Sequence, residues 1–240
     1  KYRIIYVNDN SNDDSKNILL KFMSENKTIN MDLINNKENM GPAYSRYIAY
    51  NKANDHEICI FLDGDDWLVE KETLKILSHV YKNNNIYSTF GSNFPNGRVC
   101  GEARYKNIKR ETENSFFPHL RTAYAFLCKN IPKKYLKYNN EEWLKVKTDV
   151  ALFISTIELC NNKYAVIKHK LMHYNMYNSI NNTNTGFRNF KINPNKQKSM
   201  REKYKKYISN LKKLKPIIDK YSLTPLVSSD TASPGEKSTH

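Results

Sequence analysis

The chain has little cysteine and no long apolar run, and each absence excludes a class of protein. Its cysteines, Cys59, Cys100, Cys128 and Cys160, are widely spaced and form no CxxC pair or Cys/His group with the spacing of zinc ligands. We therefore expect reduced thiols and a cytoplasmic protein rather than a disulfide framework. No apolar segment approaches the roughly 20 residues that a membrane-spanning helix needs, so we expect a soluble globular domain.

Arginine is also scarce, although the chain is strongly basic. The net charge is +15, but 31 lysines stand against 8 arginines, alongside 32 asparagines. Readers of nucleic acid usually draw more heavily on arginine, so nucleic acid is a disfavoured partner. Residues 195–220 contain 10 basic and 2 acidic residues, which predicts a basic helix, interrupted at Pro216. That helix leaves open a peripheral contact with a membrane or another anionic surface.

Short apolar runs alternate with helical patterns along the first part of the chain, which predicts an α/β fold with a mostly parallel sheet. In such sheets, ligands bind beyond the carboxyl ends of the strands. The expected strands are 2–7, 29–35, 57–63 and 86–92, with a strand pair or a strand and turn from 164 onward. The expected helices are 11–27, 41–53, 70–84 and 141–159, and residues 93–140 are expected to be irregular.

An acidic cluster follows the third predicted strand. The segment "ICIFLDGDDWL" (58–68) places Asp63, Asp65 and Asp66 within four positions. Carboxylates this close raise one another's pKa unless a cation is present, and Mg²⁺ and Mn²⁺ prefer oxygen ligands. Gly64 would allow a tight turn, and Trp67 with the next residue would re-enter the core. The alternative is a solvated turn without a metal.

Three motifs in order resemble the family 2 glycosyltransferases of the GT-A fold. They are "IIYVNDNSND" (4–13), "NMGPAYSRYIAYNKA" (39–53) and the acidic segment itself. The resemblance implies a Rossmann-like sheet flanked by helices, a nucleotide-diphospho-sugar donor, which we expect to be UDP-linked, and a Mn²⁺ or Mg²⁺ ion on its diphosphate. In the first motif, Asp9 would contact the nucleotide base, and Asn8 replaces the family's first aspartate.

The resemblance also assigns the rest of the donor site. It places Ser11 in the first loop, puts Asn39 and Arg46 on an N-x-G-x-x-x-x-R pattern, and gives the metal to the cluster of Asp63, Asp65 and Asp66. The family normally has one more strand before the position where this chain starts. We therefore expect that the native N-terminus precedes residue 1, or that the exposed sheet edge is compensated.

An inverting transfer also needs a carboxylate to take the proton from the acceptor hydroxyl. Asp149 precedes an apolar helical pattern, where the family carries an acidic motif, and it is the expected base. Glu141 and Glu142 are alternatives, and a carboxylate at a helix start can also serve stability alone.

Two further segments resemble one subset of these transferases. They are "PHLRTAYAFL" (118–127) and "HYNMYNSIN" (173–181), which would line the acceptor side. Their polar and aromatic side chains could bind sugar hydroxyls or a phosphate and pack on a pyranose. The candidates are His119, Arg121, Tyr174, Asn175 and Asn178. His173 is a further candidate, as a late metal ligand.

The expected organisation follows from these assignments. Residues 1–92 form the nucleotide-sugar-binding half and 93–190 the acceptor-side half of one domain. Residues 191–222 form the basic C-terminal helix, and 223–240 a tail expected to be disordered. The expected function is metal-dependent, inverting sugar transfer to a glycan, lipid-linked or protein acceptor. A nucleotidyltransferase is less favoured because its glycine-rich, basic phosphate loop is replaced by the acidic "NDNSND", and a nucleic-acid or anionic-surface binding module remains a second alternative.

Overall fold

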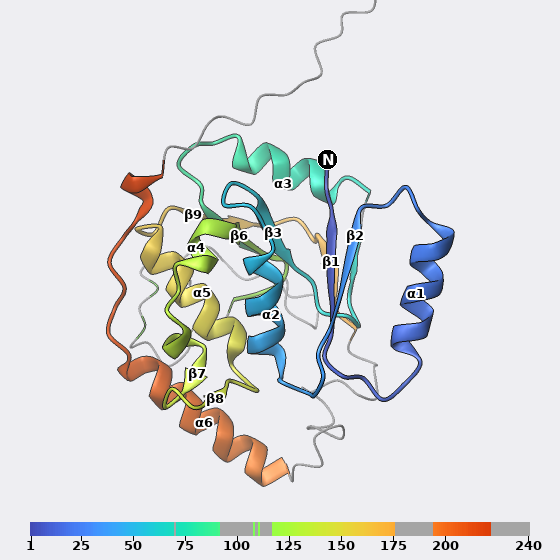
Figure 1. Ribbon diagram of the computed structural model, residues 1–240. Helices are drawn as coiled ribbons and strands as arrows, with labels where there is room; N and C mark the ends of the chain where they lie inside the picture. Colours follow the sequence, from blue (N-terminus) through green and yellow to red (C-terminus); the bar gives the residue numbers. More distant parts are fainter. Residues whose placement is uncertain (70, 92–107, 109, 111–116, 176–193, 222–240) are drawn as a thin grey trace, which may run out of the picture.

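The computed structural model describes residues 1–69, 71–91, 108, 110, 117–175 and 194–221 (Figure 1). The strands are β1 (Ile4–Asn8), β2 (Met31–Asn35), β3 (Ile58–Phe61), β4 (Trp67–Leu68), β5 (Ser88–Gly91), β6 (Arg121–Tyr124), β7 (Lys137–Tyr138), β8 (Glu142–Trp143), β9 (Tyr164–Ile167) and β10 (Met172–His173). The helices are α1 (Ser15–Glu25), α2 (Pro42–Asn51), α3 (Thr73–Tyr81), α4 (Ala125–Lys129), α5 (Thr148–Leu159) and α6 (Pro194–Asn210), with short 3₁₀ turns η2 (Lys133–Tyr135) and η4 (Ile218–Lys220).

The first two predicted strands pair as expected. β1 and β2 are parallel, with Ile4 opposite Met31 and Asn8 opposite Asn35. Both strands are rich in Ile, Leu, Val and Met, which suit a pleated, half-buried surface. Their carboxyl ends therefore lie side by side, where the side chains of Asn8 and Asn35 share a hydrogen bond of 3.1 Å.

A second sheet has the order β3-β6-β5-β9. β5 and β9 are parallel, whereas β6 is antiparallel to both β3 and β5. Three of these four strands thus share one direction, and the α/β fold is confirmed with a mixed sheet. The expectation that 93–140 is wholly irregular is wrong from residue 121 onward, because β6 and α4 form there. All four residues of β6 are buried, so the strand lacks the alternation of apolar and polar residues that would have predicted it.

Helices cover both faces of this sheet. Ten of the twelve residues of α5 are buried, and six of these, all apolar, join the main hydrophobic core. Phe61 of β3 faces this side, with its ring 5.5 Å from that of Phe153. The preceding residue, Ile60, packs on a second cluster that includes Leu77 of α3. Since consecutive strand residues point to opposite faces, α3 and α5 lie on opposite sides of the sheet.

Two predicted helices have different bounds in the structure. The helix expected over 141–159 begins at Thr148, because Glu142 and Trp143 pair with β7 in a short hairpin. The basic helix, expected over 191–222 with an interruption at Pro216, spans Pro194–Asn210. One face of α6 is buried, with Tyr204 0 % and Ile208 2 % exposed, so it is an integral part of the core rather than a free basic helix.

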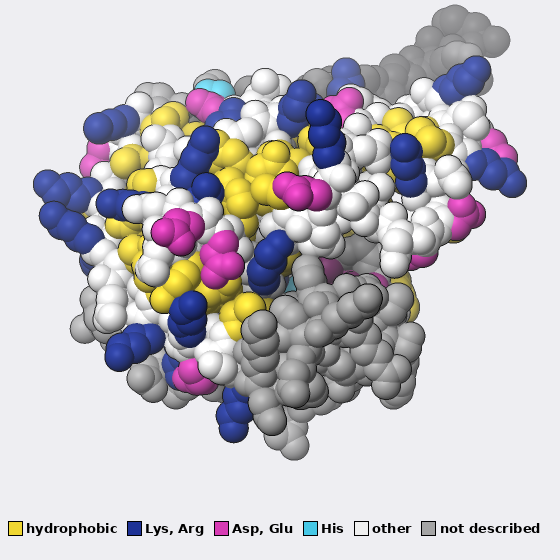
Figure 2. All heavy atoms as spheres, turned by 60° about the horizontal axis from the view of Figure 1, so that its bottom comes forward, with side chains coloured by type: hydrophobic (Ala, Val, Ile, Leu, Met, Phe, Trp, Pro, Cys, Tyr) yellow, Lys and Arg dark blue, Asp and Glu magenta, His cyan; other side chains and the backbone are white. Residues whose placement is uncertain are grey.

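The basic side chains of the face seen in Figure 2 are dispersed among apolar and acidic ones rather than gathered in one patch. Across the part of the chain that the structure describes, no helix combines the length and the apolar character that crossing a membrane requires. The expected tail, 223–240, and most of the boundary regions of the expected units lie outside the described residues. The division into those units therefore stays a prediction.

Candidate active site

The acidic loop begins directly after β3 and turns back on itself. The backbone N–H of Asp66 donates to the carbonyl of Asp63 at 3.0 Å. Asp66 is buried, and its Oδ1 accepts a hydrogen bond of 2.9 Å from the backbone N–H of Asn175. Its Oδ2 is buried without a hydrogen-bond partner among the described residues. One carboxylate oxygen therefore stays available for a ligand.

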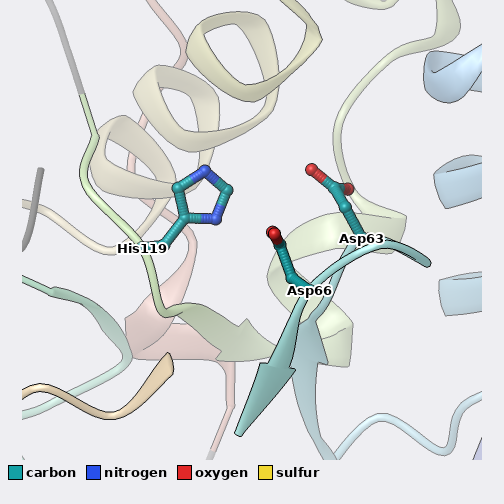
Figure 3. Close-up of side chains that lie close together, drawn as sticks. All are labelled: Asp63, Asp66 and His119. Carbon is teal, nitrogen blue, oxygen red and sulfur yellow. The ribbon is translucent and has the colours of Figure 1, made fainter. Parts of the chain in front are cut away.

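A histidine from a distant part of the chain faces this loop. Figure 3 shows His119 and the carboxylates of Asp63 and Asp66 pointing toward one another. One ligand atom from each of the three residues lies within 4.8 Å of the other two. The Asp63 side chain is 43 % exposed, so the group can be approached from the side of Asp63. Such a constellation has the size and the donor atoms of a divalent-cation site.

Arg46 of α2 connects the acidic loop to the start of α5. Its Nη2 donates to Asp63 Oδ1 at 2.8 Å, and its Nη1 donates to the hydroxyl of Thr148. Partial removal from water alone would raise the pKa of Asp63. The positive charge of Arg46, with a smaller contribution from Arg121, more than offsets this and holds the pKa of Asp63 at about 2.

Arg121 of β6 makes the second connection. Its side chain is only 5 % exposed, and its Nη2 lies 2.7 Å from His119 Nε2 and 3.3 Å from Asp149 Oδ2. Its Nε donates to the carbonyl of Phe117 at 2.7 Å. Burial would raise the pKa of Asp149, but Arg121 and then Arg46 hold it below the ordinary value, so Asp149 is ionised. The expected base is thereby linked to the acidic loop through two arginines.

Asp66 has the opposite electrostatic balance. Burial is the largest cause that raises its pKa, the negative charges of Asp65 and Asp63 add to it, and the pKa reaches about 7 despite the opposing bond from Asn175. An isolated carboxylate in this position is costly to ionise. A divalent cation next to the loop would remove that cost, so the residues present fit a metal.

A glycine permits the approach of His119 to the carboxylates. Gly91 ends β5, and a Cβ on it would lie 1.8 Å from the carbonyl oxygen of His119 and 2.7 Å from the backbone nitrogen of Leu120. No side chain fits in that space. The glycine of the acidic loop is different, because Gly64 lies outside the left-handed region and its Cβ would meet only the Tyr6 hydroxyl, at 3.7 Å. The tight turn expected of Gly64 therefore does not depend on glycine.

The residues expected at the nucleotide lie at the ends of β1 and β2. Asp9 Oδ1 accepts from the backbone N–H of Met40 at 2.9 Å, and its Oδ2 accepts from that of Gly41 at 2.7 Å. Gly41 has a φ of +88°, a conformation that favours glycine. Asp9 thus holds the loop that leads into α2 by two hydrogen bonds. Its contact with the nucleotide base stays a prediction.

The other residues expected at the nucleotide belong to the same two loops. Asn8 is buried, and its Oδ1 accepts from the backbone N–H of Ser11 at 3.1 Å. The carbonyl of Asn39 accepts from Lys145 Nζ at 3.1 Å. Asn8 and Ser11 therefore shape the first loop, while Asn39 joins the second loop to the segment that precedes α5.

The residues expected on the acceptor side lie against the acidic loop. The Tyr174 ring is 5.4 Å from that of His119, and the Asn175 backbone binds Asp66. His173 stacks on Trp67 with ring centroids 4.3 Å apart, and Trp67 is 50 % exposed. The expectation that Trp67 re-enters the core is therefore wrong, because the β4–β10 pair presents it to solvent.

Three other residues expected in the site are not part of the contacts described above. Asn178 lies outside the described residues. Asp65 is not part of the group formed by Asp63, Asp66 and His119, so its metal role stays a prediction. Of the alternative bases, Glu142 accepts a hydrogen bond from the Tyr204 hydroxyl at 3.0 Å, on the α6 side of the molecule.

Sequence reasoning assigned His119 and Arg121 to the acceptor and missed their contacts with the acidic loop and Asp149. The signal was present, because the segment "PHLRTAYAFL" was noticed as a motif. What the sequence did not reveal is that β6 pairs with β3, with Phe61 opposite Arg121. That register brings the motif beside the carboxyl end of β3.

Comparison with known proteins bears on the same region. The family described as Glycosyl transferase family 2 matches residues 1–136, which is more than half of the chain. No curated protein sequence matches. Among solved structures, S. aureus TarS 1-349 is 22 % identical with a TM-score of 0.52, covering 71 % of this chain and 50 % of that one. A longer S. aureus TarS structure is 21 % identical with a TM-score of 0.51, covering 71 % and 30 %.

A mannosyltransferase from Pyrobaculum calidifontis, solved in complex with GDP-Man and Mn²⁺, is 16 % identical with a TM-score of 0.45, covering 70 % of this chain and 45 % of that one. The chain spans about half the length of the first TarS structure, whose likeness supports the GT-A fold. The family match covers all three motifs that carry the resemblance, and the prediction of a glycosyltransferase domain is confirmed. The chain therefore belongs to glycosyl transferase family 2.

Proposed function

We propose that this domain is a metal-dependent, inverting glycosyltransferase that moves a sugar from a nucleotide-diphospho-sugar to an acceptor hydroxyl. One observation carries the proposal: two arginines each hold a carboxylate, one in the acidic loop and one at the start of α5. Arg46 links Asp63 to the start of α5, and Arg121 links His119 to Asp149. Such an arrangement can hold an anionic donor and still keep one ionised carboxylate for proton transfer.

The metal would be held by the acidic loop. Asp63 is accessible, Asp66 has a buried oxygen without a partner among the described residues, and Asp65 stands between them in the sequence. Mn²⁺ and Mg²⁺ both favour such oxygen ligands. When bound, the metal would act as a Lewis acid that neutralises charge on the leaving nucleoside diphosphate.

Arg46 would orient the diphosphate. Its side chain is 17 % exposed and its guanidinium already lies against Asp63, at the edge of the proposed metal site. An arginine presents several donors in a planar fork, which suits phosphate oxygens. The resemblance of the N-x-G-x-x-x-x-R pattern supports the same role.

Asp149 would be the base. It lies in the first turn of α5, its side chain is 24 % exposed, and its lowered pKa keeps it ionised at neutral pH. The acceptor oxygen would bond to the anomeric carbon while the bond from that carbon to the phosphate oxygen breaks. The hydroxyl proton would pass to Asp149, and the bonding electron pair would leave with the diphosphate. Attack opposite the leaving group inverts the configuration.

The nucleotide would lie toward β1, against the loops that hold Asn8, Asp9, Ser11 and Asn39. The choice of UDP follows from the resemblance of the motifs. The acceptor would be a glycan, a lipid-linked sugar or a protein, approached from the side of Tyr174 and Asn175. Residues 195–220 would provide any peripheral contact with a membrane. The buried face of α6 makes a nucleic-acid module the weaker alternative.

A thermal-shift panel tests the proposal. UDP, GDP and dTDP are each added with Mn²⁺, with Mn²⁺ and excess EDTA, or alone. We expect one nucleotide to raise the melting temperature only when Mn²⁺ is free. If none of the three does so, the proposal fails.

Two variants separate the roles within the site. Asp65→Ala should abolish Mn²⁺-dependent hydrolysis of the matching nucleotide sugar, whereas Asp149→Asn should retain nucleotide binding and lose transfer. Glu25→Ala, an exposed carboxylate on α1, is the matched control and should change neither. Loss of nucleotide binding in Asp149→Asn would contradict the assigned base.

A further inference from the structure

The hydrogen bond of His119 uses Nε2, and this determines whether Nδ1, the nitrogen that faces the acidic loop, can bind a metal. Its Nε2 lies 2.7 Å from Arg121 Nη2, a hydrogen-bond distance. A guanidinium only donates, so the lone pair in this bond must belong to Nε2. A neutral imidazole with its lone pair on Nε2 carries its proton on Nδ1. Arg121 therefore fixes the tautomer of His119.

The other edge of the ring faces the acidic loop. In Figure 3 the Nδ1 edge of His119 is turned toward Asp66. Nδ1 is buried without a hydrogen-bond partner among the described residues, and so is Asp66 Oδ2. A donor and an acceptor, each buried and each without a partner in the described part of the chain, thus face one another across the space between the His119 ring and the Asp66 carboxylate. Leaving either group unpaired is costly, so the space is suited to a ligand that satisfies both.

We propose that Arg121 is a positioning residue that holds His119 as an Nδ1–H donor to a phosphate oxygen of the nucleotide diphosphate, rather than as a metal ligand. A metal-bound diphosphate offers both partners that the space lacks: a cation for the carboxylates and an anionic oxygen for an N–H group. This inference rests on the proposed function. It identifies the diphosphate as the part of the donor that His119 recognises.

Arg121 also orients the carboxylate of Asp149, the proposed catalytic base. Nη2 of Arg121 bears two hydrogens, and its second neighbour is Asp149 Oδ2 at 3.3 Å. Its Nε is anchored on the Phe117 carbonyl. One buried side chain therefore sets both the group that would face the leaving diphosphate and the carboxylate that would take the acceptor proton.

The protonated nitrogen can be observed directly. The full chain, labelled with ¹⁵N-histidine, is examined by long-range ¹H–¹⁵N correlation, and the His119 signals are assigned by their loss in His119→Asn. We expect a protonated Nδ1 and an unprotonated Nε2 in the wild type. In Arg121→Lys we expect a mixture of tautomers, because lysine keeps the charge but not the fork geometry. If that variant does not fold, the wild-type spectrum still decides, and a protonated Nε2 would overturn the proposal.

Measuring Mn²⁺ affinity distinguishes two roles of His119, a hydrogen-bond donor to phosphate and a metal ligand. Mn²⁺ alone is titrated against each variant, and free Mn²⁺ is measured by electron paramagnetic resonance. Asp66→Asn should weaken Mn²⁺ binding by about tenfold or more, whereas His119→Asn should leave it unchanged. Equal weakening in the two variants would make His119 a metal ligand and overturn the proposal.

Nucleotide binding completes the test. With Mn²⁺ present, His119→Ala should weaken binding of the matching nucleoside diphosphate by about tenfold, the loss expected for a hydrogen bond to a charged group. His119→Asn should stay closer to the wild type, because its amide retains an N–H donor. His169→Asn, at an exposed histidine, is the matched control. If none of UDP, GDP and dTDP binds the wild type, the proposed function fails as well; if one binds but His119→Ala does not weaken it, only this inference fails.

Discussion

Two layers of the molecule bury similar apolar residues to very different degrees. In the N-terminal layer, formed by β1, β2 and α1, Leu19 is buried, but Ile18 is 63 % and Phe22 is 41 % exposed. In the central layer, formed by the β3-β6-β5-β9 sheet with α5, every residue of β5 and β6 is buried. The residues of the proposed metal site and base belong to the central layer, whereas Asp9 belongs to the N-terminal one. The residues of the proposed chemistry therefore lie against the better-buried layer, and the residue expected at the nucleotide base lies on the less buried one.

The largest expected effect is a core truncation in the central layer. Phe153 is 1 % exposed and its ring lies 5.9 Å from that of Phe117. Phe153→Ala removes this packing and leaves a cavity, which costs about 3–5 kcal/mol in the free energy of unfolding. Phe22→Ala in α1 is the matched control and should change it by less than about 0.5 kcal/mol. Urea unfolding measures both, and equal losses would contradict the difference between the layers.

The next effect comes from the backbone contact at the end of β5. Gly91→Ala places a Cβ where the His119 carbonyl lies, so the strand segment must move at a cost of about 1–3 kcal/mol. Gly64→Ala is the matched control, since its Cβ meets only an ordinary contact and the unfolded chain loses freedom. We expect urea unfolding to show a loss for Gly91→Ala and no loss for Gly64→Ala. A loss in Gly64→Ala alone would mean that the acidic loop, not the strand end, is the constrained element.

The same comparison explains what the sequence could predict. The motifs from residue 4 to residue 68 follow one another along the chain, so their strands, helices and order were readable from local pattern. The sequence pattern predicted that the loops after β1 and β3 lie at the ligand-binding edge of one parallel sheet, whereas in the structure β1 pairs with β2 and β3 belongs to the other sheet. For this reason Asp9 and the acidic loop were found as candidates before any coordinates.

The second half of the site depends on contacts between distant residues. Arg121 and Asp149 are brought together by β6 pairing next to β3 and by α5 packing on that sheet, and neither is a local property of the sequence. The sequence of β6, Arg-Thr-Ala-Tyr, shows no alternation of apolar and polar residues, and all four residues are buried. Trp67 was misplaced for a similar reason: its neighbour His173 comes from the distant strand β10, and the paired strands leave the Trp67 side chain 50 % exposed.

The third effect concerns the loop that Asp9 holds. Asp9→Asn replaces one carboxylate oxygen with an amide that cannot accept, so one of the backbone N–H groups of Met40 and Gly41 loses its partner. We expect a loss of about 1–2 kcal/mol in urea unfolding, together with weaker nucleotide binding. Asp13→Asn is the matched control, because Asp13 is exposed and accepts from the Ser15 backbone within its own loop. Unchanged stability in Asp9→Asn would show that Asp9 does not position this loop.

The smallest effect tests the connection between the layers. Arg3 at the entrance to β1 binds Glu57, just ahead of β3, through two bonds of 2.7 and 3.1 Å. The hydrogen bond from Arg3 is the largest cause of a lowered pKa of Glu57. The stability from this pair is therefore present above the ordinary Glu pKa of about 4.3 and is lost as the pH falls through the lowered value in the folded protein. Because both side chains are partly exposed, Glu57→Gln should cost only about 0.5 kcal/mol at pH 7.

The pH dependence distinguishes a charge effect from a packing effect. Urea midpoints of the wild type and Glu57→Gln should differ at neutral pH and converge in acid, where Glu57 is protonated and the charge is lost in both proteins. Added salt at neutral pH should narrow the difference as well. Glu25→Gln, at an exposed pair on α1 with a separation of 4.0 Å, should show no comparable difference. If the difference between the two urea midpoints persists in acid, Glu57 stabilises the contact between the layers by its shape and hydrogen bonding. The charge of the ion pair would then add nothing to that contact.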